Sequence, residues 1–335
     1  MNVPPTTRGT STRHQGVRLI DIEGTVFQVD TVTSAAAVEL RHLDNLWIQV
    51  SGTRCNIECR HCFNSSGPRE TSFGLMTLDA VSAAVAAAGA HGVREIYFTG
   101  GEPFLHPQLL EMVACALAVA PTTVLTNGML ISDRIADTLA ALATEARYSL
   151  EVRVSLDGYT EEMNDAIRGR GVFQLALAGA VRLARRNLLP LITIVRTWED
   201  ADELAVLAAF ARVLSDARCD RPRLKVLPAL PLGRELTRVA GLQRDECVTT
   251  AMLEGFDRDL LMCSNSRLVT DRGVWVCPLL VDQPDARLGP TLDDAASSYE
   301  LRHQTCVTCW RYGAICGNVS ARIEGPDIAA APEAR

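Results

Sequence analysis

The sequence predicts an α/β protein built from repeated strand–helix units, on the basis of three observations. Short apolar or β-branched runs recur along the chain, longer segments rich in Ala, Leu and Arg separate them, and these segments carry apolar residues at helical spacing, as at Leu78, Val81, Val85 and Ala88. Six such units predict a parallel sheet, either an open partial barrel or a doubly wound sheet. In both architectures we expect chemistry at the carboxyl ends of the strands.

Six segments are the candidate strands of this sheet. They are Leu46–Val50, Glu95–Phe98, Thr123–Leu125, Glu151–Ser155, Leu191–Val195 and Leu224–Leu227. Pro228, Pro231 and Gly233 then interrupt the pattern, so the barrel is expected over residues 46–234.

The N-terminal region precedes this repeat. Residues 1–16 are polar and are expected to form a disordered leader. Val17–Asp30 alternates apolar and polar residues around Gly24, which predicts a hairpin. We place it in an N-terminal extension of hairpin and helix over residues 17–45.

The C-terminal region is rich in cysteine and has little strand–helix periodicity. A helix is expected over Arg244–Leu261 and a short hairpin over residues 266–277, and five of the eleven cysteines lie between Cys263 and Cys316. We expect a separate C-terminal subdomain over residues 235–325 and a frayed tail over 326–335.

Composition excludes several classes of protein. The chain has 335 residues, 47% of them hydrophobic, and a net charge of −7, which suits a large core and does not suit a nucleic-acid binder. Neither an uncharged apolar run of membrane length nor a secretory signal is seen. We expect a cytoplasmic protein without a membrane partner, whose many cysteines bind metal rather than form disulfides.

Three cysteines directly follow the first predicted strand. Cys55, Cys59 and Cys62 lie within one short loop, which can direct three thiolates at one metal centre and leave a further coordination site open. Soft sulfur ligands suit an iron–sulfur cluster better than a hard cation. Taken alone, the same spacing also fits a zinc loop.

The motif Cys55-x3-Cys59-x2-Cys62, with the aromatic His61 before its last cysteine, resembles the cluster motif of the radical S-adenosylmethionine (SAM) superfamily. Four further segments follow in the order familiar from that family, so that the resemblance covers roughly residues 46–228. They are Thr99-Gly100-Gly101-Glu102-Pro103, Thr126-Asn127-Gly128, Ser155-Leu156-Asp157-Gly158 and Ala166-Ile167-Arg168-Gly169. The resemblance implies a partial (β/α)6 TIM-like barrel, SAM as cofactor and a [4Fe-4S] cluster.

The resemblance also implies roles for individual residues. Gly100, Gly101, Glu102 and Pro103 match the segment that binds the methionine amino group, and glycines there allow close backbone approach while Glu102 offers a carboxylate to an ammonium group. His61 is expected near the adenine and Arg168 beside the methionine carboxylate, with Asn127, Ser155 and Asp157 as polar contacts. The alternative is that Asn127 and Ser155 cap strand ends and that Arg168 satisfies helix carbonyls.

The C-terminal cysteines look like the auxiliary-cluster extension called a twitch or, in longer form, a SPASM domain. The chain has fewer cysteines than the full SPASM pattern, so one auxiliary [4Fe-4S] cluster is expected rather than two. Cys263 and Cys277 would bind it with two of Cys306, Cys309 and Cys316, and we favour Cys306 and Cys309. The alternative is a structural zinc site with the same four sulfurs.

The resemblance leads to an expected reaction. A fully protein-ligated auxiliary cluster has no iron free for substrate and would pass electrons, as in dehydrogenation. Epimerisation instead needs a hydrogen donor, usually a thiol; Cys247 and Cys219 are the candidates, and Cys247 is the better one by position. We expect hydrogen abstraction from a sugar-type or aminocyclitol metabolite of antibiotic biosynthesis, with epimerisation preferred over dehydrogenation. Flavodoxin or ferredoxin is the expected electron donor.

Two other functions remain open. The 45 residues before the first strand are too few for a typical leader-binding module, which favours a small molecule over a ribosomal peptide as substrate. A peptide-modifying enzyme would need a leader peptide or a separate recognition protein. A non-catalytic iron–sulfur protein would release no 5′-deoxyadenosine when reduced.

Overall fold

The computed structural model describes residues 17–22, 25–30, 35–219, 221–230, 232–238 and 247–313. The expected leader, Cys316 and the expected tail lie outside the described residues. Near the N-terminus, β1 (Val17–Ile22) pairs antiparallel with β2 (Thr25–Asp30), which confirms the predicted hairpin.

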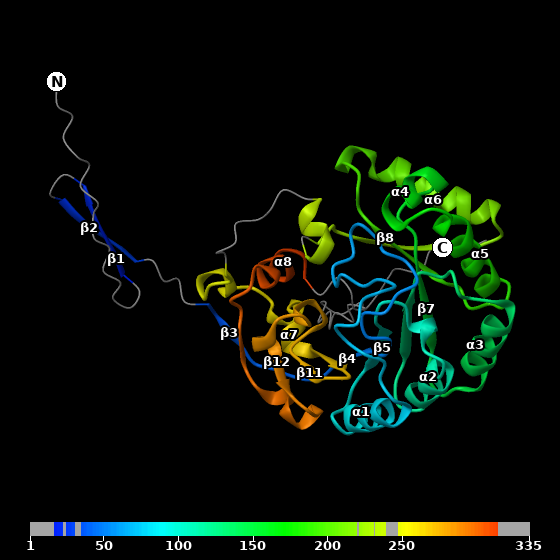
Figure 1. Ribbon diagram of the computed structural model, residues 1–335, viewed down its shortest axis with the longest axis horizontal. Helices are drawn as coiled ribbons and strands as arrows, with labels where there is room; N and C mark the ends of the chain where they lie inside the picture. Colours follow the sequence, from blue (N-terminus) through cyan, green and yellow to red (C-terminus); the bar gives the residue numbers. More distant parts are fainter. Residues whose placement is uncertain are drawn as a thin grey trace, which may run out of the picture.

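In the part of the chain that the structure describes, one sheet of nine strands forms the centre of the molecule, in the order β12-β11-β10-β4-β5-β6-β7-β8-β9. The strands from β4 to β9 are mutually parallel, as the predicted repeat requires. Their bounds are β4 (Asn45–Gln49), β5 (Glu95–Thr99), β6 (Thr122–Thr126), β7 (Leu150–Ser155), β8 (Leu191–Val195) and β9 (Arg223–Leu227). This arrangement confirms an α/β fold of the partial-barrel type (Figure 1).

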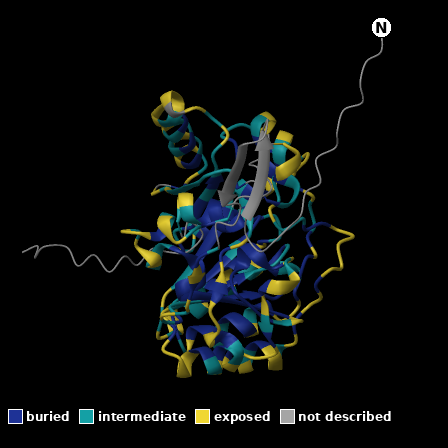
Figure 2. Cartoon of the chain, turned by 90° about the vertical axis from the view of Figure 1, so that its left-hand side faces the viewer, coloured by how far each residue is buried: buried dark blue, intermediate teal, exposed yellow. Residues whose placement is uncertain are grey.

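Helices of the described barrel segments cover the outer side of these strands (Figure 1). Three of them have capped N-termini, where the side chains of Thr77, Ser132 and Thr160 accept backbone N–H groups. The other three begin without a side-chain cap. Buried residues gather in the strands and on the inner helix faces, whereas exposed residues mark the outer turns (Figure 2). The helices are α1 (Leu78–Ala90), α2 (Leu109–Leu117), α3 (Asp133–Glu145), α4 (Glu161–Arg168), α5 (Val172–Ala184) and α6 (Glu203–Asp216).

The C-terminal region extends the barrel sheet rather than forming a detached unit. The predicted hairpin is present as β10 (Ser266–Thr270) and β11 (Gly273–Trp275), and β10 pairs in parallel with β4. Barrel residues and C-terminal residues therefore share one hydrophobic cluster. The remaining elements are β3 (Ala37–Val38), α7 (Met262–Asn265), β12 (Arg287–Gly289), β13 (Tyr299–Glu300) and α8 (Gln304–Tyr312).

The helix expected over residues 244–261 is wrong for the described part of that range. Residues 247–261 contain only two short 3₁₀ turns, Ala251–Leu253 and Arg258–Leu260. Gly255 adopts a left-handed φ of +70°, which ends the first turn, and Asp257 caps the second. Residues 35–44 likewise contain β3 and no helix.

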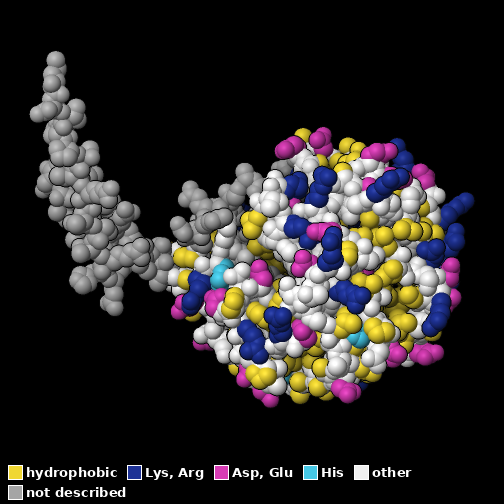
Figure 3. Space-filling view, viewed as in Figure 1, with side chains coloured by type: hydrophobic (Ala, Val, Ile, Leu, Met, Phe, Trp, Pro, Cys, Tyr) yellow, Lys and Arg dark blue, Asp and Glu magenta, His cyan; other side chains and the backbone are white. Residues whose placement is uncertain are grey.

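Charged side chains of both signs are mixed on one face of the molecule (Figure 3). Lys and Arg side chains are interspersed with Asp and Glu on the face drawn in Figure 3. None of the helices that the structure describes is both long and apolar enough to cross a membrane.

Candidate active site

The loop after β4 brings the three motif cysteines to one cavity. Cys55 and Cys59 are buried and Cys62 is half-buried, and all three line a cavity of about 210 Å³ at the carboxyl ends of the parallel strands. Backbone hydrogen bonds shape the loop: Cys55 N donates to Gly67 O at 3.1 Å, and Cys62 N donates to Cys59 O at 3.3 Å. The cysteines therefore lie at the end of the sheet where the fold predicts chemistry.

Most of the predicted cofactor-binding residues line this same cavity. His61, Gly100, Gly101, Asn127, Ser155 and Arg168 do so. Glu102, Pro103 and Asp157 are buried and do not line it. These three therefore lie behind the cavity wall, and their contact with a cofactor stays a prediction.

The glycines at the end of β5 allow the cysteine loop to pack against the strand. A Cβ atom on Gly101 would lie 2.2 Å from the Arg54 carbonyl oxygen, and one on Gly100 would lie 2.1 Å from Ser51 Oγ. Gly101 N also donates to Gly52 O at 2.8 Å. The close backbone approach that these glycines allow is thus made, in this structure, by the loop that carries the three cysteines and not by a ligand.

Glu102 joins the ends of β5 and β6. Its carboxylate is fully buried and accepts hydrogen bonds from Thr126 Oγ1 at 2.7 Å, Asn127 N at 2.7 Å and Phe104 N at 3.0 Å. Burial raises the pKa of Glu102 to about 7, although these hydrogen bonds act in the opposite direction. The carboxyl group therefore fixes the strand ends that border the cavity.

Asp157 positions two residues of the cavity wall. Its Oδ2 lies 2.7 Å from His61 Nε2 and 2.6 Å from Arg168 Nε, while Oδ1 accepts from Val195 N at 2.8 Å. Burial alone would raise the pKa of Asp157, but Arg168 and His61 outweigh it and hold that pKa well below its usual range. A buried anion thus connects the cysteine loop, α4 and β8.

The side chain of Asn127 forms hydrogen bonds with neighbouring loop residues. Its Nδ2 donates to Asn56 Oδ1 at 2.7 Å, and its Oδ1 accepts from Met129 N at 3.1 Å. These contacts resemble the capping role that was the alternative for this residue.

Sequence reasoning missed Arg234, which holds the cysteine loop in place. Its side chain donates to the carbonyl oxygens of Cys59 at 2.8 Å, Ser65 at 2.9 Å and Ser66, and its backbone N donates to Cys62 O at 3.0 Å. The preceding Gly233 has φ +53°, and a Cβ there would lie 2.2 Å from the Phe63 carbonyl oxygen. The sequence signal was Gly233, which we interpreted only as a break in the barrel pattern.

Polar atoms without partners also face the cavity. Trp47 Nε1, Gln49 Nε2 and Thr193 Oγ1 are buried, have no hydrogen-bond partner among the described residues, and belong to side chains that line the cavity. Buried polar groups usually have partners, so these atoms indicate a polar ligand in the cavity.

A second set of cysteines lines a small cavity next to the first. Cys263, Cys277, Cys306 and Cys309 surround it, whereas Cys316 lies outside the described residues. Leu279 lines both cavities. The side chain of Leu279 therefore lies between the four-cysteine site and the main cavity.

The donor chemistry of both cysteine sets fits a soft metal group. Burial raises the pKa of Cys55 and of Cys306 to about 12, so their thiolates need a metal to compensate for lost solvation. Sulfurs on a single zinc ion would lie about 3.8 Å apart, given Zn–S bonds of about 2.3 Å. The described residues contain no group of three His, Cys, Asp or Glu that could hold one metal ion.

Cys247 lies away from both cavities. It is half-buried, is not among the lining residues of either cavity, and precedes Val248, which donates its N–H to Leu301 O at 3.0 Å. Its expected position at the start of a helix is wrong, because residues 247–250 are not helical. Its role as hydrogen donor stays a prediction.

Similarity to other proteins agrees with this geometry. Mycofactocin maturase MftC of Mycobacterium tuberculosis is 32% identical over 160 residues, which are 46% of this chain and 39% of that protein. The GTP 3′,8-cyclase of Chlorobaculum tepidum is 34% identical over 139 residues, which are 40% of this chain and 39% of that protein. The chain thus spans about two fifths of the length of these relatives.

Solved structures share the fold at low identity. Streptococcus suis SuiB bound to its precursor peptide SuiA superposes with a TM-score of 0.57 at 16% identity, covering 77% of this chain and 66% of that one. The structure of anSMEcpe with AdoMet and the Cp18Cys peptide gives 0.54 at 18% identity, covering 75% and 79%. The sequence of residues 50–208 matches the radical SAM superfamily. With the three cysteines at the strand ends of a partial barrel, residues 50–208 of this chain are therefore a radical SAM superfamily domain.

Proposed function

We propose that this chain is an enzyme that removes a hydrogen atom from a C–H bond of its substrate. The substrate radical would then lose a proton to solvent and an electron to the four-cysteine site, so that the substrate is oxidised by two electrons overall. The observation that supports it is the single cavity shared by Cys55, Cys59, Cys62 and the Gly100-Gly101 strand end. When bound, a [4Fe-4S] cluster and SAM supply the 5′-deoxyadenosyl radical that abstracts the hydrogen.

The protein's own residues bind and orient these groups. The thiolates of Cys55, Cys59 and Cys62 would hold the cluster. Arg168, held by buried Asp157, lines the cavity, where it can bind a carboxylate. His61 is fixed by the same Asp157 and lies on the wall where an adenine would pack. Both side chains are thus set before the ligand binds, which lowers the entropy cost of binding.

Oxidation is better supported than the epimerisation expected from the sequence. Among the described residues that line the main cavity, the only cysteines are the three of the cluster motif, and Cys247 is not one of them. Epimerisation needs a hydrogen donor in the cavity. The four-cysteine site, by contrast, borders the cavity through Leu279, as suits an electron acceptor, and we propose one auxiliary [4Fe-4S] cluster there.

The cavity wall favours a substrate rich in hydrogen-bond acceptors. Trp47 Nε1 and Gln49 Nε2 can only donate, and both lack a partner among the described residues. Two charged side chains of the wall are already paired, Arg153 with Glu151 and Glu235 with Arg238, so they leave the unpaired donors of Trp47 and Gln49 as the groups that select a ligand. Sugar hydroxyls would suit these donors better than the ammonium groups of an aminocyclitol.

A ribosomal peptide is the second candidate substrate, because backbone carbonyls are also acceptors for Trp47 and Gln49. Solved proteins of this fold have been captured with peptides. At 16–18% identity, these two structures share the fold with this chain and do not indicate its substrate.

One turnover experiment distinguishes these outcomes. The reconstituted chain would be reduced without oxygen in deuterated water, with SAM and a panel of neutral sugars, aminocyclitols and peptides. We expect a product two hydrogens lighter than an acceptor-rich substrate, and less product from Gln49→Leu. Solvent deuterium at one carbon without a mass loss of two hydrogens would instead support epimerisation and contradict this proposal. In that case Cys247→Ala would test the donor.

A further inference from the structure

Arg267 is a buried charged residue that does not line the main cavity. Its side chain is among the largest fully buried ones, with 1% of the residue exposed, and no Asp or Glu of the described chain forms an ion pair with it. Its guanidinium donates only to backbone carbonyl oxygens. An uncompensated buried charge is costly, so the position calls for an anion.

The carbonyl partners of Arg267 belong to the segments that carry the auxiliary cysteines. Nη1 donates to Cys263 O at 2.7 Å and to Val276 O, directly before Cys277, at 3.3 Å. Nε and Nη2 donate to Ala295 O at 2.9 and 2.7 Å. One side chain therefore connects α7, the end of the β10–β11 hairpin and the loop after β12.

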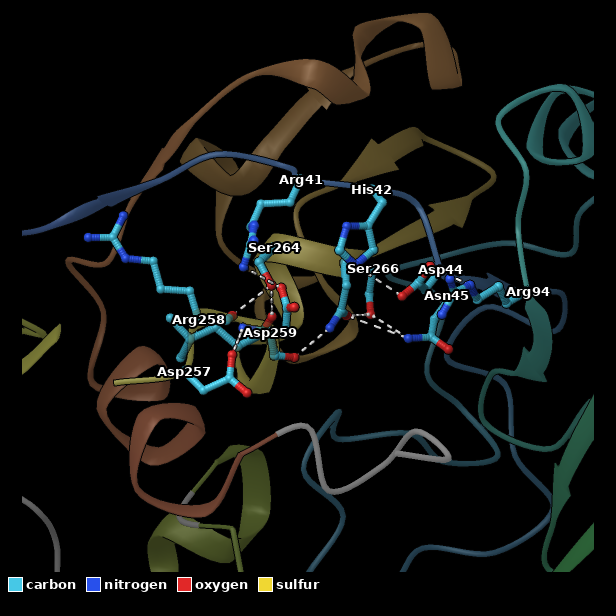
Figure 4. A network of polar contacts seen from close by, with 12 residues as sticks. Arg41, His42, Asp44, Asn45, Arg94, Asp257, Arg258, Asp259, Ser264 and Ser266 are labelled. Carbon is cyan, nitrogen blue, oxygen red and sulfur yellow. Dashed lines mark hydrogen bonds and ion pairs between the residues drawn. The ribbon is translucent and has the colours of Figure 1, made fainter. Parts of the chain in front are cut away.

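The helix that carries Cys263 is held from its other side as well. Arg41 N donates to Ser264 O at 2.8 Å, and Asp44 N donates to Asn265 O at 2.9 Å. Ser264 and Asn265 also donate to Arg258 O and Asp259 O, and the Arg41 guanidinium pairs with Asp259 (Figure 4). The Cys263 backbone is thus fixed between this polar network and Arg267.

The ionisable groups that act on the charge of Arg267 are the side chains of Cys263 and Cys277, which become anionic when they bind a metal. Burial is the larger effect and lowers the pKa of Arg267 to about 10. A cluster bound by four thiolates is anionic overall and becomes more so on reduction, and nearby charge is one of the factors that set its potential.

We infer that Arg267 is the buried counter-charge and positioning residue of the auxiliary iron–sulfur site. The inference rests on the proposed auxiliary cluster. Arg267 holds the Cys263 and Cys277 backbones in register, and its fixed charge favours the reduced state of the cluster, which makes the site a better electron acceptor for the cavity beside it.

The test uses the full chain with Cys55, Cys59 and Cys62 changed to Ala, so that only the auxiliary site can hold a cluster. In this background we compare Arg267→Lys, which keeps the charge, with Arg267→Gln, which keeps a donor and loses the charge. Arg287→Gln is the matched control, because Arg287 is exposed and also donates to a carbonyl oxygen, that of Arg272, at 2.6 Å. Iron and sulfide per chain and the midpoint potential, followed by electron paramagnetic resonance, are measured.

We expect Arg267→Gln to shift the reduction equilibrium of the cluster at least tenfold toward the oxidised state. This shift lowers the midpoint potential by about 59 mV for one electron. The midpoint potential of Arg267→Lys should lie nearer that of the parent chain, and the midpoint potential of Arg287→Gln should equal that of the parent chain. A full cluster with an unchanged potential in Arg267→Gln would overturn the inference. So would loss of the folded circular dichroism spectrum in both Arg267 variants, since Arg267 would then serve the fold alone.

Failure of the proposed function gives a different result. If the background chain with Arg267 intact binds no iron, or binds zinc instead, the auxiliary cluster itself is wrong and the inference falls with it. If neither variant holds iron yet both remain folded, the positioning role is supported.

Discussion

Arg234 Nε donates to the Cys59 carbonyl oxygen at 2.8 Å, across 175 residues of sequence. Two further side-chain bonds reach Ser65 and Ser66, so that the residue closes the cysteine loop from the far end of the barrel. Hydrogen bonds from a charged donor stabilise more than neutral ones. The shape of the loop that would hold the first cluster therefore depends on a segment outside the motif.

Arg234→Lys should reduce iron at the first site. A lysine ammonium cannot replace the planar fork that reaches three carbonyl groups, and the loss of these bonds should destabilise the loop by about 2 kcal/mol. The measurement is iron per chain after anaerobic reconstitution, in a background with Cys263 and Cys277 changed to Ala. Arg302→Lys, at an exposed pair with Glu300, is the control. Equal iron in both variants would rule out the positioning role.

Gly233→Ala should disturb the same loop through the backbone. Its φ of +53° is unfavourable for alanine, and the new Cβ would lie 2.2 Å from the Phe63 carbonyl oxygen. Gly255→Ala is a matched control, because Gly255 also has a positive φ, +70°, but no atom within 4 Å of the added Cβ. Thermal unfolding and iron content should show a larger loss for Gly233→Ala. Similar losses would mean that backbone strain alone explains the glycine.

Glu102→Gln should remove a pH dependence of stability. The folded-state pKa of about 7 lies above the ordinary glutamate value of 4.5, so the folded chain binds more protons and its stability falls as pH rises from about 4.5 to 7. This group's contribution over that range is at most about 3 kcal/mol. Urea unfolding at pH 5.5 and pH 8 measures the difference, which should be smaller in Glu102→Gln than in the exposed control Glu111→Gln. The prediction fails if both variants keep the same difference.

Asp157→Asn should weaken SAM binding and stability together. The amide keeps the acceptor for Val195 N but removes the negative charge between His61 and Arg168, and breaking a buried ion pair costs about 3–5 kcal/mol. Asp137→Asn, at an exposed pair with Arg186, should change little. Isothermal titration with SAM and urea unfolding measure the two effects. An unaltered SAM affinity of Asp157→Asn would show that Asp157 plays no part in SAM binding.

Local sequence patterns predicted most of the fold. The β-branched and apolar runs gave all six parallel strands, and Leu191–Val195 agrees with β8 at both ends. The helix expected over residues 244–261 was wrong because helical spacing of apolar residues was weighed above Gly255. Pairing of β10 with β4 could not be foreseen, since strand order depends on contacts between segments more than 200 residues apart.

In the candidate site, too, local motifs could be predicted from the sequence and long-range contacts could not. The cysteine spacing and the glycine pair lie in short motifs, so they could be read from the sequence. The contacts of Arg234, Asp157 and Arg267 could not, because each residue acts on backbone or side chains that only the folded chain brings near. Asp157 illustrates this: its carboxylate orients His61 and Arg168 from behind the cavity wall.

The most direct test of the central claim is release of 5′-deoxyadenosine from SAM on anaerobic reduction, measured by chromatography for the reconstituted chain and for Cys59→Ala. We predict release by the parent chain and none above the reductant blank for Cys59→Ala, whose missing sulfur leaves the cluster site with two cysteines. No release by the iron-loaded parent chain would contradict the account and support a non-catalytic iron–sulfur protein.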